Sequence, residues 1–226
     1  MRTLLPETIV FDLDGTLIDT APDLTSALNA VLTRQHLPEL PLAQVRQMVG
    51  RGARVLIENA LASHQIATDP QRTIELEKHF IEFYNSNIAV ASRPFEGMED
   101  TIRQLASKGH KIGICTNKPE YLSRKLLAEL KLEHLFPAVL GADSRPYRKP
   151  DPRHLFDTIA ALGGDPSNAV LVGDSQTDAL TAHAANIPVI LVTFGYTETP
   201  VSEMGAAATI DHFRELEAAL SLCSRA

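Results

Sequence analysis

The chain has 226 residues, of which 44% are hydrophobic and 22% are charged, a composition typical of a globular protein with one large domain or with a modest insertion. Its formal net charge of -7 argues against nucleic acid and anionic membranes as partners, because both repel an acidic surface. The stretch 179–197 lacks charged residues, but Asn186 and Pro188 divide it into a helix end and a strand, so we expect no membrane span and a cytoplasmic protein.

The first predicted element is a buried strand that ends in two acids. Residues 9–11 are Ile, Val and Phe, and Asp12, Asp14, Gly15 and Thr16 follow. An apolar run of this kind predicts a parallel strand buried on both faces, and glycine accepts the backbone angles of the turn after it. Two carboxylates this close repel each other, which is costly for folding alone. A divalent cation and a phosphate between them would remove that cost.

The pattern then becomes helical, and later alternates. From Asp19 to about Ala91 the apolar residues have helical spacing, and almost nothing predicts a strand. From Arg93 onward, short apolar strands alternate with helices that carry a 3.6-residue apolar stripe. The predicted strands are 111–115, 138–141, 169–172, 189–192 and 207–210. The predicted helices are 99–108, 121–130, 153–162, 175–185 and 213–222.

Strand–helix alternation predicts an α/β fold with a doubly wound parallel sheet, as in Rossmann-like cores. The helical block interrupts that pattern after the first strand. We therefore expect a catalytic core made of residues 1–18 and 93–226, and a small α-helical cap domain made of residues 19–92. The expected hinge segments are the small residues at 16–20, Pro94 and Gly97.

Polar clusters follow several of the predicted strands. Ligands of parallel sheets bind beyond the carboxyl ends of the strands, so these clusters are the candidate site. Besides the two aspartates after the first strand, they are Thr116-Asn117-Lys118, Arg148-Lys149-Pro150-Asp151, and Gly173-Asp174-Ser175 with Asp178. Each cluster alone is a weak signal, because Thr, Asn, Ser and Asp also cap helices.

Taken together, the four motifs resemble the haloacid dehalogenase superfamily in its phosphatase form. The first motif of that superfamily is Asp-x-Asp-Gly-Thr, here residues 12–16, and the other motifs follow in the superfamily's order from there to about residue 196. The resemblance implies a Mg²⁺-dependent phosphomonoester hydrolase that acts through an aspartyl-phosphate intermediate. A carboxylate can act as such a nucleophile.

The resemblance also implies roles for individual residues. Asp12 would be the nucleophile, and Asp14 would protonate the departing alkoxide and later deprotonate the attacking water. Lys149 would neutralise Asp12 and stabilise the transferring phosphoryl group. Thr116, the backbone amide of Asn117, and Lys149 would bind the phosphate oxygens.

For the metal, the resemblance implies that Mg²⁺ is held by Asp12, by the backbone carbonyl of Asp14 and by Asp174. Oxygen ligands of this kind suit a hard cation. Asp178, one helical turn after Asp174, would hold metal-bound water from outside the direct ligand set.

Variant residues weigh against other branches of the superfamily. The dehalogenases lack the acid at Asp14, and the phosphonate-cleaving branch needs a cap lysine, of which this cap has only Lys78. A β-phosphoglucomutase-like mutase is disfavoured because the histidine that this branch usually has five residues after the start of its Asp-Thr pair is missing: Asp19-Thr20 is followed by Pro22, Asp23 and Leu24. The open alternatives are a sugar-phosphate phosphatase (including amino-sugar acid phosphates), a pyrophosphatase, that mutase, and a non-enzymatic phosphate-binding protein.

Substrate selection should come from the cap. Residues 49–54 read Val-Gly-Arg-Gly-Ala-Arg, similar to a segment of phosphoglycolate phosphatases, which implies hydrolysis of 2-phosphoglycolate to glycolate and phosphate. Arg51 departs from the asparagine common there. Arg51 or Arg54 could pair with the substrate's carboxylate, or both could be solvated arginines in a helix–helix turn. We expect a small phosphorylated metabolite as substrate, and a monomer or homodimer.

Overall fold

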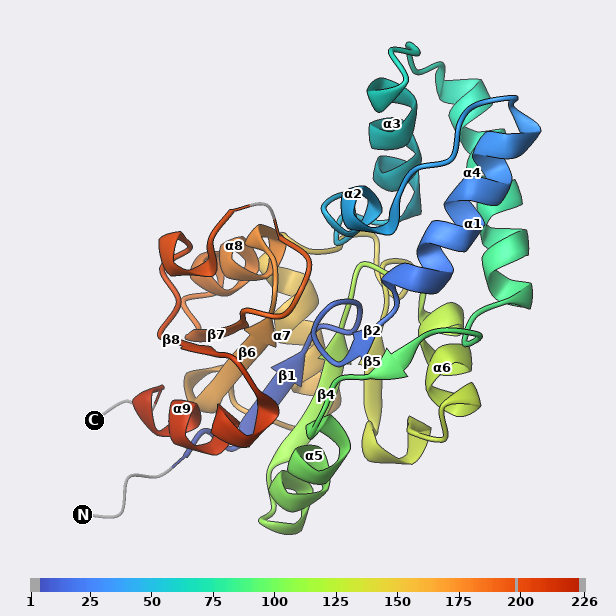
Figure 1. Ribbon diagram of the computed structural model, residues 1–226. Helices are drawn as coiled ribbons and strands as arrows, with labels where there is room; N and C mark the ends of the chain where they lie inside the picture. Colours follow the sequence, from blue (N-terminus) through green and yellow to red (C-terminus); the bar gives the residue numbers. More distant parts are fainter. Residues whose placement is uncertain (1–4, 198, 224–226) are drawn as a thin grey trace.

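The protein is built around a six-stranded, entirely parallel sheet with strand order β5-β4-β1-β6-β7-β8 (Figure 1). The computed structural model describes residues 5–197 and 199–223. The strands are β1 Thr8–Phe11, β4 Lys111–Cys115, β5 Ala138–Leu140, β6 Ala169–Gly173, β7 Val189–Val192 and β8 Ala208–Ile210. This confirms the predicted doubly wound α/β fold, and the apolar runs at β4 and β7 have the predicted bounds.

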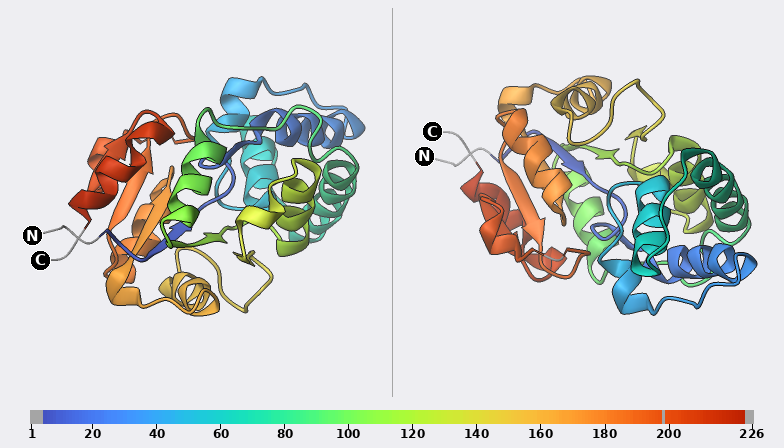
Figure 2. Two further views of the ribbon diagram at one scale, coloured as in Figure 1. Left: turned by 90° about the horizontal axis from the view of Figure 1, so that it is seen from below. Right: turned by 90° about the horizontal axis from the view of Figure 1, so that it is seen from above.

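Helices cover both faces of this sheet, as the two views of Figure 2 show. Side chains of successive strand residues point to opposite faces. Ile9 and Phe11 of β1 therefore pack in one apolar cluster with α5, α6 and α9, and Val10 packs in the other with α7 and α8. The helices are α5 Met98–Ser107, α6 Glu120–Glu129, α7 Pro152–Ala161, α8 Gln176–Ala184 and α9 Leu216–Leu222. Short 3-10 turns lie at η1 Glu133–Leu135, η2 Pro166–Asn168, η3 Val201–Glu203 and η4 Phe213–Glu215.

The last predicted helix, 213–222, is therefore a 3-10 turn followed by α9. The side chain of His212 accepts a hydrogen bond from the backbone N–H of Arg214 and starts the turn, and the α-helical part begins at Leu216. None of the helices in the described residues is both long enough and apolar enough to cross a membrane.

The four helices of residues 19–92 stand over the carboxyl ends of the strands (Figure 1). They are α1 Ala21–Arg34, α2 Leu42–Arg46, α3 Ala53–Ser63 and α4 Pro70–Ser86. We call residues 19–92 the cap, and we infer that it is the domain expected there. Its buried side chains, such as Leu28 and Phe80, belong to the same apolar cluster as one face of the sheet.

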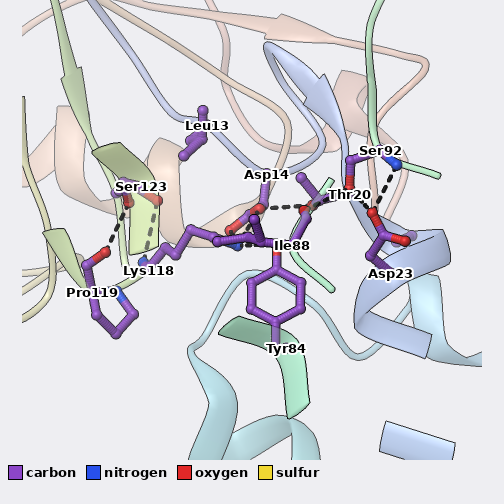
Figure 3. A network of polar contacts seen from close by, with 12 residues as sticks. Leu13, Asp14, Thr20, Asp23, Tyr84, Ile88, Ser92, Lys118, Pro119 and Ser123 are labelled. Carbon is purple, nitrogen blue, oxygen red and sulfur yellow. Dashed lines mark hydrogen bonds and ion pairs between the residues drawn. The ribbon is translucent and has the colours of Figure 1, made fainter. Parts of the chain in front are cut away.

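The two chain segments that enter and leave the cap are hydrogen-bonded to each other. β2 (Ile18–Asp19) and β3 (Arg93–Pro94) form a short antiparallel pair, which the sequence did not reveal because two residues carry no periodicity. Beside it, the buried carboxylate of Asp23 accepts hydrogen bonds from the backbone N–H of Ser92 at 2.8 Å and from its hydroxyl at 2.6 Å (Figure 3). The expected hinge segments thus lie side by side.

Candidate active site

The predicted catalytic motifs converge at one edge of the sheet. In register, Phe11 of β1 lies opposite Ile114 of β4 and Val172 of β6, so these three strands end at the same level. The residues that follow them carry the polar side chains Asp12, Thr116 and Asp174, and all three residues are buried. Parallel register is therefore what brings together motifs more than 150 residues apart in sequence.

Three of the acids form one buried cluster. Carboxylate oxygens of Asp12, Asp174 and Asp178 all lie within 4.8 Å of one another. Lys149 supplies a buried counter-charge: its Nζ lies 3.0 Å from Oδ1 of Asp12 and 2.6 Å from Oδ1 of Asp178. One ammonium group facing three carboxylates leaves this cluster short of positive charge.

Burial shifts the ionisation of these groups. It raises the pKa of Asp12 to about 6, against the opposing attraction of Lys149. Burial, and then the charges of Asp178 and Asp12, hold the pKa of Asp174 well above its ordinary value. A hard divalent cation binds ionised carboxylates and would relieve this excess of negative charge. The donor set therefore fits a hard divalent metal ion.

Asp174 is oriented by hydrogen bonds from two neighbours. Its Oδ1 accepts from the hydroxyl of Thr16 at 3.0 Å, and its Oδ2 accepts from the backbone N–H of Tyr196 at 2.6 Å. Gly15, with φ +81°, leaves the room for this: a Cβ there would lie 2.4 Å from Oδ2 of Asp174. The glycine of the first motif is thus required by both its backbone angle and the close approach of Asp174.

Asp178 has a second task besides its contact with Lys149. Its Oδ2 accepts hydrogen bonds from the backbone N–H of Ser175 at 3.1 Å and from the hydroxyl of Ser175 at 2.7 Å. Ser175 and Asp178 are the N-cap and N3 residues of the capping box of α8, in which each side chain accepts from the backbone N–H of the other residue. Asp178 therefore holds the lysine and the helix start in place, and its position outside the direct ligand set stays a prediction.

Asp14 lies in a different polar network, with Lys118 of the core and Thr20 and Tyr84 of the cap (Figure 3). Its carboxylate lies 3.0 Å from Nζ of Lys118 and accepts a 2.7 Å hydrogen bond from the hydroxyl of Thr20. Lys118 also donates to the hydroxyl of Tyr84, on α4, at 2.8 Å. The two acids of the first motif thus have different surroundings, one with Lys149 and the metal candidates and the other with Lys118 and the cap.

Sequence reasoning missed several residues of this site. Lys118 belongs to the Thr116-Asn117-Lys118 motif, which implies no role for it, and the spacing of Tyr84 predicts a core residue of an amphipathic helix. Tyr196 follows β7, the strand next to β6, but no sequence motif points to it. Its hydroxyl accepts from the backbone N–H of Ala21 at 3.0 Å and donates to Asp19, so it ties the loop that holds Asp174 to the start of the cap.

The phosphate-binding candidates Thr116 and Asn117 border a cavity of about 50 Å³ between core and cap. Nδ2 of Asn117 donates to the backbone oxygen of Gly50 at 3.3 Å and to that of Lys149 at 3.1 Å. Asn117 therefore joins the tip of the cap to the loop that carries the catalytic lysine candidate. Gly50 and Gly52 also border the cavity, so the cap presents backbone to it at this point.

The two cap arginines lie elsewhere. Arg54 forms an ion pair with Glu77 on α4, with Nε at 2.9 Å and Nη2 at 2.7 Å from the same oxygen. Arg51 is exposed and borders an outer groove with Gln176 and Tyr196. Neither side chain borders the cavity that holds Asp12 and Asp14, and their contact with substrate stays a prediction.

The sequence matches a family model over residues 9–192, and that model describes haloacid dehalogenase-like hydrolases. The match covers well over half of the chain, so the protein belongs to the haloacid dehalogenase-like hydrolase family. The resemblance inferred from the motifs is therefore confirmed.

Two relatives with high sequence identity to this chain are both named phosphoglycolate phosphatase. The chain is 48% identical to a phosphoglycolate phosphatase of Caulobacter vibrioides, over 92% of this chain and 88% of the relative. It is 47% identical to a phosphoglycolate phosphatase of Mesorhizobium japonicum, over 94% of each chain. Among solved structures, a predicted phosphoglycolate phosphatase from Haemophilus somnus superposes with a TM-score of 0.87 at 29% identity, covering 94% of this chain and 96% of that one.

Proposed function

We propose that this protein is a phosphoglycolate phosphatase, which hydrolyses 2-phosphoglycolate to glycolate and inorganic phosphate. Its membership of a hydrolase family and its relatives of that name make it a phosphoric monoester hydrolase. The observation that carries the mechanism is the separation of Asp12 from Asp14. Both acids border the cavity, but Asp12 is paired with Lys149 and Asp14 is paired with Lys118.

Asp12 acts as the nucleophile. Its carboxylate attacks phosphorus, a P–O bond forms to give the aspartyl-phosphate, and the bond to the glycolate oxygen breaks. Asp14 donates a proton to that departing oxygen, because an alkoxide is a poor leaving group. Water then attacks the aspartyl-phosphate, Asp14 accepts a proton from it, and phosphate and Asp12 are released.

The remaining residues hold the phosphate and balance its charge. Lys149, buried 3.0 Å from Asp12, stabilises the negative charge of the transferring group. Thr116 and the backbone amide of Asn117 bind phosphate oxygens at the end of β4. Burial of this edge under the cap keeps bulk water away from the transferring group.

Magnesium is the proposed cofactor. Asp12, Asp174 and the backbone carbonyl of Asp14 would hold it, and Asp178 would support it from outside the ligand set. Bound there, the ion would offset the negative charge of the carboxylates and of the phosphoryl oxygens. The excess of buried carboxylates around Lys149 supports this assignment.

The test is release of inorganic phosphate from a panel of esters, with Mg²⁺ and with EDTA. The panel holds 2-phosphoglycolate, hexose and amino-sugar phosphates, nucleotides and pyrophosphate. Metal-dependent release with a preference for 2-phosphoglycolate is expected. A preference for another ester would overturn the substrate assignment. Turnover by an Asp12→Asn variant, shown by mass spectrometry to be free of deamidation, would overturn the nucleophile.

A further inference from the structure

The cavity between core and cap is lined by one positively charged side chain among the described residues. Among the described residues that border it, Lys118 is the only basic one, and the two acids are Asp12 and Asp14. Most of the remaining wall is apolar and comes from both the cap and the core, including Leu56 and Phe80. A buried anionic group needs a charged partner. A second anionic group of the substrate, besides its phosphate, would find that partner in Lys118.

Lys118 has more hydrogen-bond donors than its contacts within the protein use. Its ammonium carries three N–H donors. It approaches Asp14 Oδ1 at 3.0 Å and Oδ2 at 3.3 Å, which one donor can share, and it donates to Tyr84 at 2.8 Å. These contacts occupy two of the three donors, so one N–H of Lys118 remains for a ligand.

Tyr84 adds a second donor at the same place. An ammonium cannot accept a hydrogen bond, so the hydroxyl of Tyr84 is the acceptor in its contact with Lys118. Burial raises the pKa of Tyr84 to about 12, so the hydroxyl keeps its own proton. Within the described part of the chain, Lys118 is its hydrogen-bond partner, which leaves that proton available to a ligand. The ring is also 4.4 Å from Nζ of Lys118 and fixes the lysine from the cap side.

We propose that Lys118 and Tyr84 bind the second anionic group of the substrate, a carboxylate close to the phosphate ester, in place of the cap arginines. This rests on the proposed function and deepens it. Asp14 must reach the ester oxygen, and Lys118 is in contact with Asp14. An anion bound at Lys118 is therefore separated from the ester oxygen by a short spacer, which matches the single methylene of 2-phosphoglycolate. Because Tyr84 comes from α4, this site is complete only when the cap covers the core.

The experiment compares kcat/KM for 2-phosphoglycolate and for 2-hydroxyethyl phosphate, in which an alcohol replaces the carboxylate. The variants are Tyr84→Phe, which keeps the buried ring, and Lys118→Met, which keeps the length of the chain. Each should lower the ratio of the two kcat/KM values by about tenfold or more, as expected for the loss of a hydrogen bond to a charged group. Arg54→Met is the matched cation control, and its ratio should equal that of the wild type.

Equal losses for both esters in Tyr84→Phe, with circular dichroism showing an intact fold, would overturn the inference. So would a fall of the ratio in Arg54→Met alone. A binding measurement separates this from failure of the proposed function. Calorimetry with the Mg²⁺-loaded wild type should show tighter binding of 3-phosphonopropionate than of 3-hydroxypropylphosphonate, and Tyr84→Phe should remove the difference. If that difference is found without turnover of 2-phosphoglycolate, the anion site stands and the phosphatase assignment fails. If the wild type shows no difference, the inference is wrong.

Discussion

The buried acids make the stability of the metal-free protein fall as pH rises, which is opposite to the usual behaviour of carboxylates. The pKa of Asp12 is raised from 3.8 to about 6, so between these values the folded protein holds a proton that the unfolded chain has lost. Stability decreases wherever the folded state binds more protons and the pH increases. The shift corresponds to about 3 kcal/mol by pH 7, and Asp174 acts in the same direction.

The perturbation that tests this is Asp12→Asn, which removes the charge and keeps the shape. Without metal at pH 7, the variant should be more stable than the wild type by about 3 kcal/mol, because it avoids the cost of an ionised Asp12. At pH 4 both proteins carry a neutral group there, and their free energies of unfolding should agree within about 1 kcal/mol. Added Mg²⁺ should stabilise the wild type much more than the variant at pH 7, since the ion binds the ionised cluster.

The assay is urea denaturation followed by circular dichroism at pH 4 and pH 7, in EDTA and in Mg²⁺. Asp100→Asn, at an exposed position of α5, is the matched control, and its difference from the wild type should not depend on metal. If the wild type is the more stable protein at pH 7 in EDTA, the attraction of Lys149 outweighs the burial of Asp12. The charge argument for a cation at this cluster would then be refuted.

Three further predictions concern single residues. Lys149→Met should destabilise the metal-free protein by about 3–5 kcal/mol, because it leaves buried carboxylates without their ammonium partner, and thermal unfolding measures this. Asp14→Asn should lower kcat for alkyl phosphates by about 10²–10⁴-fold and for p-nitrophenyl phosphate far less, so equal losses would contradict its role as acid. Gly15→Ala should lower both stability and Mg²⁺ affinity, seen by calorimetry, because its Cβ would displace the Asp174 carboxylate. An unchanged Mg²⁺ affinity would show that the turn shifts to make room for the Cβ and that Asp174 stays in place.

The local sequence pattern was sufficient to predict the strands and helices of the core. The bounds of β4 and β7 agree with the prediction because an apolar run between polar residues marks a buried parallel strand without ambiguity. The convergence of Asp12, Thr116 and Asp174 was also predictable, since the carboxyl ends of parallel strands share one edge of the sheet. The short β2–β3 pair was not, because two-residue strands form only where tertiary structure brings them together.

The sequence by itself determined the fold class, the order of the catalytic motifs and the family, because these depend on residue type and spacing along the chain. Only the tertiary structure decided which charges meet. It pairs Arg54 with Glu77 on the neighbouring helix, and it brings Tyr84 of the cap to Lys118 of the core. Helical periodicity marks a side chain as buried without indicating its partner. The physical reason is that a contact between core and cap depends on how two separately patterned units are placed, which no local spacing records.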